Sequence, residues 1–203
     1  MQDLILEIQT KIDLDRNLLY YDQSVKTILS ESRHNHCLYC AAIANIIAKN
    51  NRIEKEKIEK CVTAAILHDI TKEFKEQTHR DLMQQQNQSE KLDEFPKSLW
   101  HAITGKVYVR KNLNVNDPEI LEAIRFHTTG NPGMGIVAKI VFAADYFSSK
   151  HMINSDLDID KSLDTLCLEK TTSSLIYLVE ENKPVHHDTI DFYHHLIESM
   201  YGK

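Results

Sequence analysis

Residues 62–69 read Val-Thr-Ala-Ala-Ile-Leu-His-Asp and close a helical pattern that begins near Glu54. The end of this stretch is apolar on every side, and a helix that is apolar all round is buried in a core. His68 and Asp69 should therefore emerge near the centre of the molecule. A buried imidazole or carboxylate is costly unless it has a partner, so the pair predicts a polar site inside the fold.

The rest of the composition favours a compact all-α protein. The 203 residues include only 5 glycines and 4 prolines, and so few turn formers argue for long helices. Hydrophobic residues make up 42% of the chain, which is enough for a sizeable core. The spacing of apolar residues predicts about eight to ten helices. Their expected ranges are 2–12, about 13–31, 33–50, 54–69, short helices within 72–96, 97–111, 117–127, 135–150, 160–182 and 187–201.

Charge and segment patterns exclude several classes of protein. The formal net charge is −6, and an acidic surface repels phosphodiester backbones, so we expect no nucleic-acid partner. No apolar run approaches the roughly 20 residues that span a bilayer, and the N-terminal residues do not resemble a signal peptide. Four cysteines are too few for a disulfide framework. We therefore expect a reduced, cytoplasmic protein without a membrane partner, either a monomer or a homodimer.

Six histidine and aspartate side chains stand in or beside apolar helical stretches. They are His36, His68, Asp69, His101, His127 and Asp145. Burying several such groups calls for a shared partner, and a divalent cation is the usual one. Adjacent helical residues differ by about 100° in direction, but a cation at a helix end can still contact both His68 and Asp69. The sequence thus predicts a buried metal site.

The same stretches carry a resemblance to a known family. They are Arg33-His34-Asn35-His36, LHDITK (67–72), HAITG (101–105), IRFHTTGNPGM (124–134) and AADY (143–146). Together they resemble the HD-domain metal-dependent phosphohydrolases over about residues 20–150. The segment 124–134 is most similar to the YqeK-type subfamily, the bacterial symmetrical bis(5′-nucleosyl)-tetraphosphatases.

The resemblance implies an all-α HD-domain bundle with a buried dinuclear metal site. Residues 1–30 would be N-terminal helices on a core of residues 31–150, and residues 151–203 would extend the same domain. One metal would be held by His36, His68, Asp69 and Asp145. Asp69 would bridge to a second metal held by His101 and His127. Iron is the expected metal, with manganese, cobalt or nickel as the other possibilities.

The implied reaction is hydrolysis of diadenosine tetraphosphate to two ADP by a metal-activated hydroxide. The nucleotide partners would be a dinucleoside tetraphosphate and ADP or GDP. His68, Asp69 and Lys72 would be catalytic, and Lys72, about one helical turn after Asp69, is the best candidate for a phosphate contact. The predicted substrate-binding residues are Lys72, His101, Arg125, Thr128, Thr129 and Gly130.

Two departures from the family pattern keep other functions open. The family usually continues after Ala-Asp-Tyr with Glu-Pro and then Arg, whereas residues 147–151 here read FSSKH, and Asn131 stands where arginine is more typical. Both changes remove charge or rigidity beside the expected phosphate site. The alternatives are another HD phosphohydrolase, acting on a nucleoside monophosphate, a deoxynucleoside triphosphate or a cyclic dinucleotide, and a nucleotide-binding module without turnover.

Other conspicuous residues have structural interpretations. Cys37 and Cys40 are not expected to form a metal site, and Cys40 is expected to pack behind His36. Trp100 is expected to form part of the core wall. Arg33 is expected to be an ion-pair or structural residue. The C-terminal histidines, at 186, 187, 194 and 195, are expected on a solvated helix face.

Overall fold

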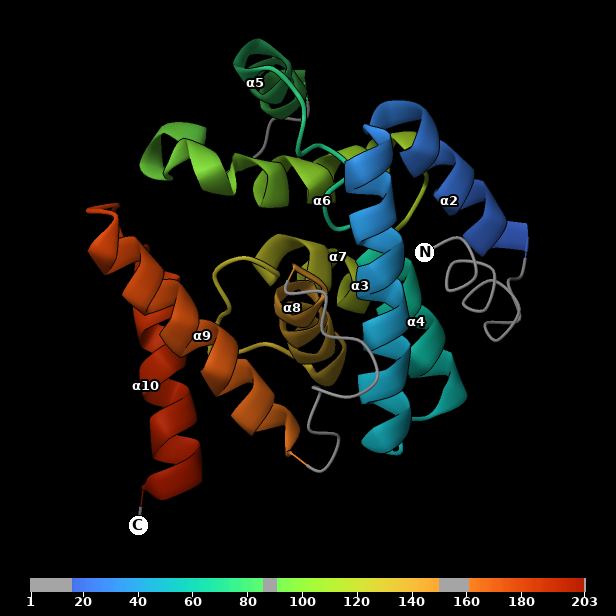
Figure 1. The fold of residues 1–203 in the computed structure, drawn as a ribbon. Coiled ribbons are helices and arrows are strands. Elements are labelled where there is room, and N and C mark those ends of the chain that lie inside the picture. Colours follow the sequence, from blue (N-terminus) through green and yellow to red (C-terminus); the bar gives the residue numbers. More distant parts are fainter. Residues whose placement is uncertain (1–15, 86–90, 150–160, 203) are drawn as a thin grey trace.

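The computed structural model describes residues 16–85, 91–149 and 161–202 (Figure 1). These ranges contain helices and no strand, so the predicted all-α class is confirmed. The α-helices are α2 (Arg16–Ile28), α3 (Glu31–Asn50), α4 (Lys55–Leu67), α5 (Glu76–Gln85), α6 (Trp100–Asn112), α7 (Pro118–Phe126), α8 (Ile136–Ser149), α9 (Leu163–Glu180) and α10 (His187–Tyr201). Two short 3-10 turns, η1 (Leu92–Glu94) and η2 (Lys97–Leu99), precede α6.

The second half of helix α4 is buried, as its apolar sequence predicts. Every residue from Cys61 to Leu67 is buried, and α4 packs against α3, α7 and α8. Figure 1 looks nearly along α8, with α3 and α4 on one side of it and α9 and α10 on the other. The end of α4 therefore lies inside the bundle.

Side-chain caps fix helix boundaries that the spacing of apolar residues predicts only to within a few residues. The Ser30 side chain accepts a hydrogen bond from the Arg33 amide and begins α3, so α2 ends at Ile28 and not near Glu31. Asp117 caps α7 by accepting from the amides of Glu119 and Ile120, with Pro118 in the first turn, as the sequence indicated. Helix α4 ends at Leu67, two residues before its predicted end, which leaves His68 and Asp69 in the turn that follows.

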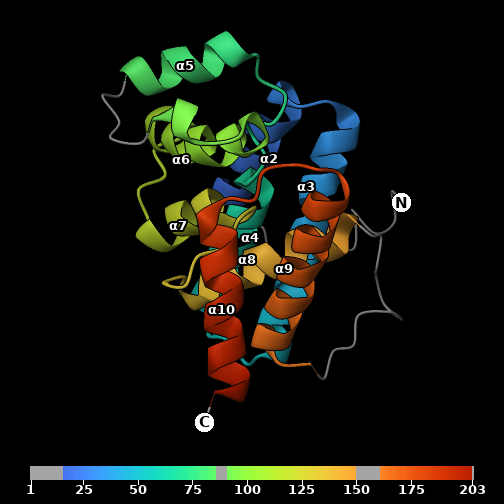
Figure 2. The same cartoon turned by 90° about the vertical axis from the view of Figure 1, so that its left-hand side faces the viewer.

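The last two helices belong to the main core. Leu166 and Cys167 of α9 and Phe192 and Leu196 of α10 join the same buried cluster as α3, α4 and α8. Figure 2 shows α9 and α10 side by side along the bundle. Cys37, Cys40, Cys61 and Cys167 are all buried free thiols, which agrees with the packing role predicted for Cys40.

A second, smaller cluster lies between α5 and α6. Trp100 is 3% exposed there and its indole Nε1 donates to the Leu92 carbonyl over 2.9 Å, so its predicted place in the core wall is confirmed.

No helix among the described residues is long and apolar enough to cross a membrane. The helix expected at 2–12, and Lys150 and His151, lie outside the described residues.

Gly130 has a structural use that corrects its predicted role in phosphate binding. Its amide donates to the Phe126 carbonyl over 2.9 Å and so closes the end of α7. Its φ is +68°, a left-handed conformation that suits glycine. A Cβ atom at this position would lie 2.2 Å from the Phe192 ring. The amide is thus already engaged within the fold.

We predict that Gly130→Ala lowers the free energy of unfolding by about 2–3 kcal/mol, because it adds both backbone strain and a clash with Phe192. Denaturant unfolding measures the change. Gly133→Ala is the matched control, since its Cβ would meet only the Asn131 side chain at 3.3 Å, and its effect should stay under about 1 kcal/mol. Equal stability of the two variants would contradict this assignment.

Candidate metal centre

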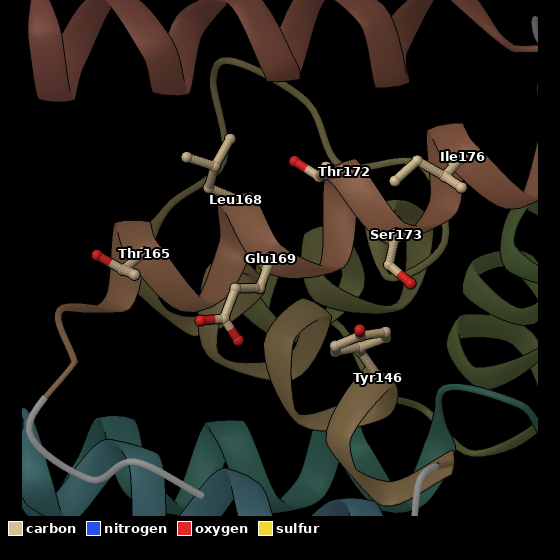
Figure 3. Close-up of a pocket in the computed structure, with 7 residues that line it drawn as sticks. All are labelled: Tyr146, Thr165, Leu168, Glu169, Thr172, Ser173 and Ile176. Carbon is tan, nitrogen blue, oxygen red and sulfur yellow. The ribbon is translucent and has the colours of Figure 1, made fainter.

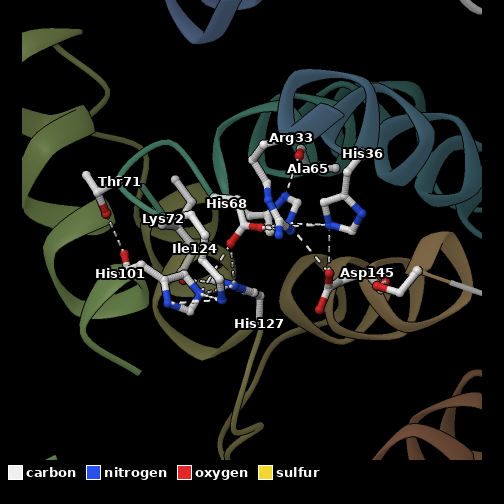
Figure 4. A network of polar contacts seen from close by, with 12 residues as sticks. Arg33, His36, Ala65, His68, Thr71, Lys72, His101, Ile124, His127 and Asp145 are labelled. Atoms are coloured by element: carbon white, nitrogen blue, oxygen red, sulfur yellow. Dashed lines mark hydrogen bonds and ion pairs between the residues drawn. The ribbon is translucent and has the colours of Figure 1, made fainter. Parts of the chain in front are cut away.

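The six predicted side chains converge from five parts of the chain. All of them except Asp69 are labelled in Figure 4. His36 comes from α3, His68 and Asp69 from the end of α4, His101 from α6, His127 from the end of α7 and Asp145 from α8. His68, Asp69, His101 and His127 are between 0% and 3% exposed, whereas His36 and Asp145 are half-buried. The cluster therefore lies inside the bundle and reaches its surface on the α3–α8 side.

Asp69 lies between two groups of these side chains. Its Oδ2 is 3.5 Å from His68 Nε2 and 3.8 Å from His36 Nε2. Its Oδ1 is 3.2 Å from His101 Nε2 and 3.5 Å from His127 Nε2. Each oxygen thus faces a different pair of imidazoles, and both sets of atoms are close enough together to share one ion each.

Asp145 completes the first group. Its Oδ1 lies 3.1 Å from His36 Nε2 and 3.6 Å from His68 Nε2. The first group therefore has three side chains besides Asp69, and the second has two. This division matches the one that the family resemblance implied.

The ends of two helices fix which nitrogen faces the centre. His68 Nδ1 lies 2.7 Å from the Ala65 carbonyl, and His127 Nδ1 lies 2.8 Å from the Ile124 carbonyl, three residues earlier in each case. A carbonyl only accepts, so each Nδ1 carries the proton and donates. In the neutral rings, Nε2 then presents a lone pair to the cluster, which is the form of histidine that binds metals.

Imidazole nitrogens and carboxylate oxygens lie close together at the centre. His101 Nε2 and His127 Nε2 are 3.1 Å apart, and His36 Nε2 and His68 Nε2 are 3.3 Å apart. Asp69 Oδ1 is buried and has no hydrogen-bond donor among the described residues. A buried polar atom without a partner is costly, and a buried carboxylate surrounded by imidazoles calls for positive charge. Imidazole nitrogens and carboxylate oxygens suit iron, manganese, nickel or zinc, so the cluster fits divalent cations.

The electrostatics of the cluster also favour positive charge. Burial raises the pKa of Asp69, but His68 and the neighbouring imidazoles outweigh it and hold that pKa well below its usual range. Burial lowers the pKa of His68, whereas the carboxylates of Asp69 and Asp145 raise it, with a net value of about 10. Burial lowers the pKa of both His101 and His127. Asp69 is therefore ionised and His101 and His127 are neutral, whereas His68 holds a proton that a bound cation would displace.

Comparison with known proteins places this geometry in a family. The model of the HD domain matches residues 33–150, which contain all six side chains. The chain belongs to the HD-domain family. It is 30% identical to proteins of Halalkalibacterium halodurans and Bacillus subtilis that are named symmetrical bis(5′-nucleosyl)-tetraphosphatase. The alignments cover 86% and 85% of this chain and 94% of each relative.

A solved structure agrees with this HD-domain fold. It comes from Clostridium acetobutylicum and is described as a predicted HD superfamily hydrolase involved in NAD metabolism. The TM-score is 0.78 at 23% identity, over 89% of this chain and 96% of that one. The predicted resemblance to the HD hydrolases, and to the symmetrical tetraphosphatases among them, is confirmed.

Two cationic side chains of the HD domain border the cluster. Arg33 Nη1 donates to Asp69 Oδ2 over 2.9 Å, which confirms the expected ion-pair role. Lys72 Nζ lies 3.1 Å from His101 Nε2, and desolvation lowers the pKa of Lys72, although the residue as a whole is exposed. Figure 4 shows Lys72 beside His101. Lys72 is the residue for which the sequence predicted a phosphate contact.

The other predicted substrate contacts lie in different surroundings. The hydroxyls of Thr128 and Thr129 are buried and have no hydrogen-bond partner among the described residues. Arg125 is only 5% exposed and its guanidinium packs over the rings of Phe95 and Phe126, 5.1 and 4.9 Å from their centroids. The two hydroxyls are therefore enclosed without a partner among the described residues, and Arg125 is packed into the protein.

Two hollows lie near the HD-domain site. One, of about 360 Å³, opens beside His36 and is lined by Ser32, Arg33, Asn35, His36, Tyr39, Ser148 and Ser149. The other, of about 450 Å³, lies between Tyr146 of α8 and the face of α9 that carries Glu169 and Ser173 (Figure 3). Only the first includes residues of the cluster, so it offers the more direct approach to the site.

The prediction that the C-terminal histidines lie on a solvated helix face is only partly correct. His187 and His194 are exposed and His195 is half-buried, whereas His186 is 8% exposed. His186 Nδ1 accepts from the Asp188 amide and caps α10, and its ring stacks on Phe95. Its burial therefore follows from capping and stacking, which a helical periodicity does not reveal.

Sequence reasoning missed Lys170, a buried residue of α9. It is 4% exposed, and its Nζ lies 2.8 Å from Asp145 Oδ2 and 2.6 Å from the His127 carbonyl. Lys170 is four residues after Leu166 and three after Cys167, so it shares their buried helix face. A lysine on an apolar face was the signal that could have found it.

We predict that Thr71→Val lowers the free energy of unfolding by about 1–3 kcal/mol. The buried Thr71 hydroxyl donates to the His101 carbonyl over 2.9 Å and lies 3.1 Å from the Thr104 hydroxyl, and valine would remove both contacts. Denaturant unfolding measures the loss. Thr172→Val, at a half-buried position on α9, is the control and should change stability by less than about 0.5 kcal/mol. Matching losses in both variants would show that the bond to His101 contributes nothing specific.

Proposed function

We propose that this protein is a symmetrical bis(5′-nucleosyl)-tetraphosphatase that cleaves diadenosine tetraphosphate to two ADP. The observation that carries the proposal is the position of Asp69, whose two oxygens each face a separate pair of buried imidazoles. The relatives that bear this activity in their names support it, because they align over most of their own length.

In this proposal the six side chains hold two divalent cations, with iron as the expected metal. His36, His68 and Asp145 serve one ion, His101 and His127 serve the other, and Asp69 serves both. Two such cations, when bound, would supply an activated water and neutralise phosphate charge. Phosphoryl transfer depends mainly on positioning and charge, which the remaining side chains can provide.

The chain's own residues would position the tetraphosphate. Lys72 can donate to a phosphate oxygen from the His101 side, and Arg33 adds positive charge beside Asp69. The buried hydroxyls of Thr128 and Thr129 need acceptors, which phosphate oxygens can supply. The hollow lined by Asn35 and Tyr39 adjoins this region and offers space for one nucleoside.

The experiment is product analysis after incubation with diadenosine tetraphosphate and Fe²⁺ or Mn²⁺. We expect ADP as the sole nucleotide product, resolved by anion-exchange chromatography. ATP plus AMP would contradict symmetrical cleavage. No turnover with iron, manganese, cobalt or nickel would contradict the enzyme itself. Faster turnover of a nucleoside monophosphate, a deoxynucleoside triphosphate or a cyclic dinucleotide would favour a different HD phosphohydrolase.

The Asp69→Asn variant tests whether the hydrolysis takes place at the cluster around Asp69. Loss of a shared ligand removes several kcal/mol of charge stabilisation, so turnover should fall about a thousandfold or more. Asp191→Asn changes an exposed carboxylate of α10 and should retain turnover. Circular dichroism checks that both variants fold. Activity that survives in Asp69→Asn would assign the reaction to another site or to a contaminant.

A further inference from the structure

Lys170 is an internal cation with well-defined partners. It projects from α9 and is 4% exposed, so its ammonium depends on protein groups in place of water. Its Nζ donates to Asp145 Oδ2 over 2.8 Å and to the His127 carbonyl over 2.6 Å, and it lies 4.2 Å from the centroid of the Phe142 ring. The ammonium therefore connects the C-terminal helix pair to two parts of the HD-domain cluster.

The contact with Lys170 gives the two carboxylate oxygens of Asp145 different partners. Oδ2 is taken by the ammonium, whereas Oδ1 faces His36 Nε2 at 3.1 Å and His68 Nε2 at 3.6 Å. We propose that Lys170 is a positioning residue that restricts Asp145 to a single donor oxygen, Oδ1, toward the bound cation. This inference rests on the metal site of the proposed function.

Such a restriction matters because a carboxylate can bind a cation through one oxygen or through both. An unrestrained Asp145 could offer both oxygens and occupy a coordination position that water or a phosphate oxygen needs. Catalytic metal sites keep such a position open. Lys170 would therefore preserve reactivity, and it would not be needed to increase metal affinity.

The chain offers a matched control for this role. Lys139 of α8 pairs with Asp164 of α9 over 2.8 Å, so it links the same two helices through an ion pair of the same kind. Neither residue belongs to the six of the cluster. A loss that reflects only weaker docking of α9 should therefore appear in Lys139→Met as well as in Lys170→Met.

The test compares Mn²⁺ binding to the wild type, Lys170→Met and Lys139→Met. Equilibrium dialysis gives the affinity, and water-proton relaxation reports the water on bound Mn²⁺. For Lys170→Met we expect reduced relaxation per bound Mn²⁺, an affinity equal to or higher than that of the wild type, and turnover lower by about 10–100-fold. Lys139→Met should match the wild type in all three, whatever its thermal stability.

Lys170→Gln covers the case in which the methionine variant does not fold. Its neutral amide can still donate to the His127 carbonyl, so it removes the charge while a polar partner remains. We expect the same loss of relaxation from it.

Three results would overturn the inference. The first is unchanged relaxation in the folded Lys170 variants, and the second is Mn²⁺ affinity weakened about 10–100-fold with unchanged hydration, which is the signature of a purely structural support. The third is an identical change in Lys139→Met. Failure of the proposed function is distinguishable from these results, because the wild type would then bind no Mn²⁺ at the cluster or would bind it without hydrolysing diadenosine tetraphosphate.

Discussion

The structure depends on one electrostatic constraint: four imidazole nitrogens crowd around the ionised carboxylate of Asp69. Four imidazole nitrogens lie 3.2–3.8 Å from its two oxygens, and two pairs of those nitrogens lie 3.1 and 3.3 Å apart. Such an arrangement is unfavourable unless positive charge is present. The fold supplies some at the margin through Arg33 and Lys72, and the centre fits divalent cations.

The bundle meets this constraint by using helix ends. His68 and His127 each follow the last residue of a helix, where the carbonyl three residues earlier is free to accept from Nδ1. This single local device orients both rings without any other side chain. It also explains how the apolar second half of α4 can deliver a charged residue to the core, since Asp69 lies just beyond the helix.

Much of this arrangement could be read from the sequence, because burial and periodicity are local signals. The apolar run 62–67 predicted that His68 and Asp69 lie at the centre, and Asp117-Pro118 predicted where α7 begins. The six-residue cluster followed from histidines and aspartates in apolar surroundings, with the family resemblance alongside. Their service as metal ligands remains a proposal.

What sequence reasoning missed depends on contacts between distant segments. Lys170 reaches Asp145 and His127 from another helix, and Gly130 is required by Phe192, 62 positions further along the chain. His186 is buried because it stacks on Phe95, which lies before α6. No local pattern encodes such pairings, although a lysine on the apolar face of α9 was a usable warning.

The most direct measurement is anomalous X-ray diffraction from crystals of the protein loaded with Mn²⁺. The account predicts two peaks on opposite sides of the Asp69 carboxylate, one beside His36, His68 and Asp145 and the other beside His101 and His127. The absence of any peak at Asp69, or a single peak elsewhere, such as at His186–Asp188, would contradict it.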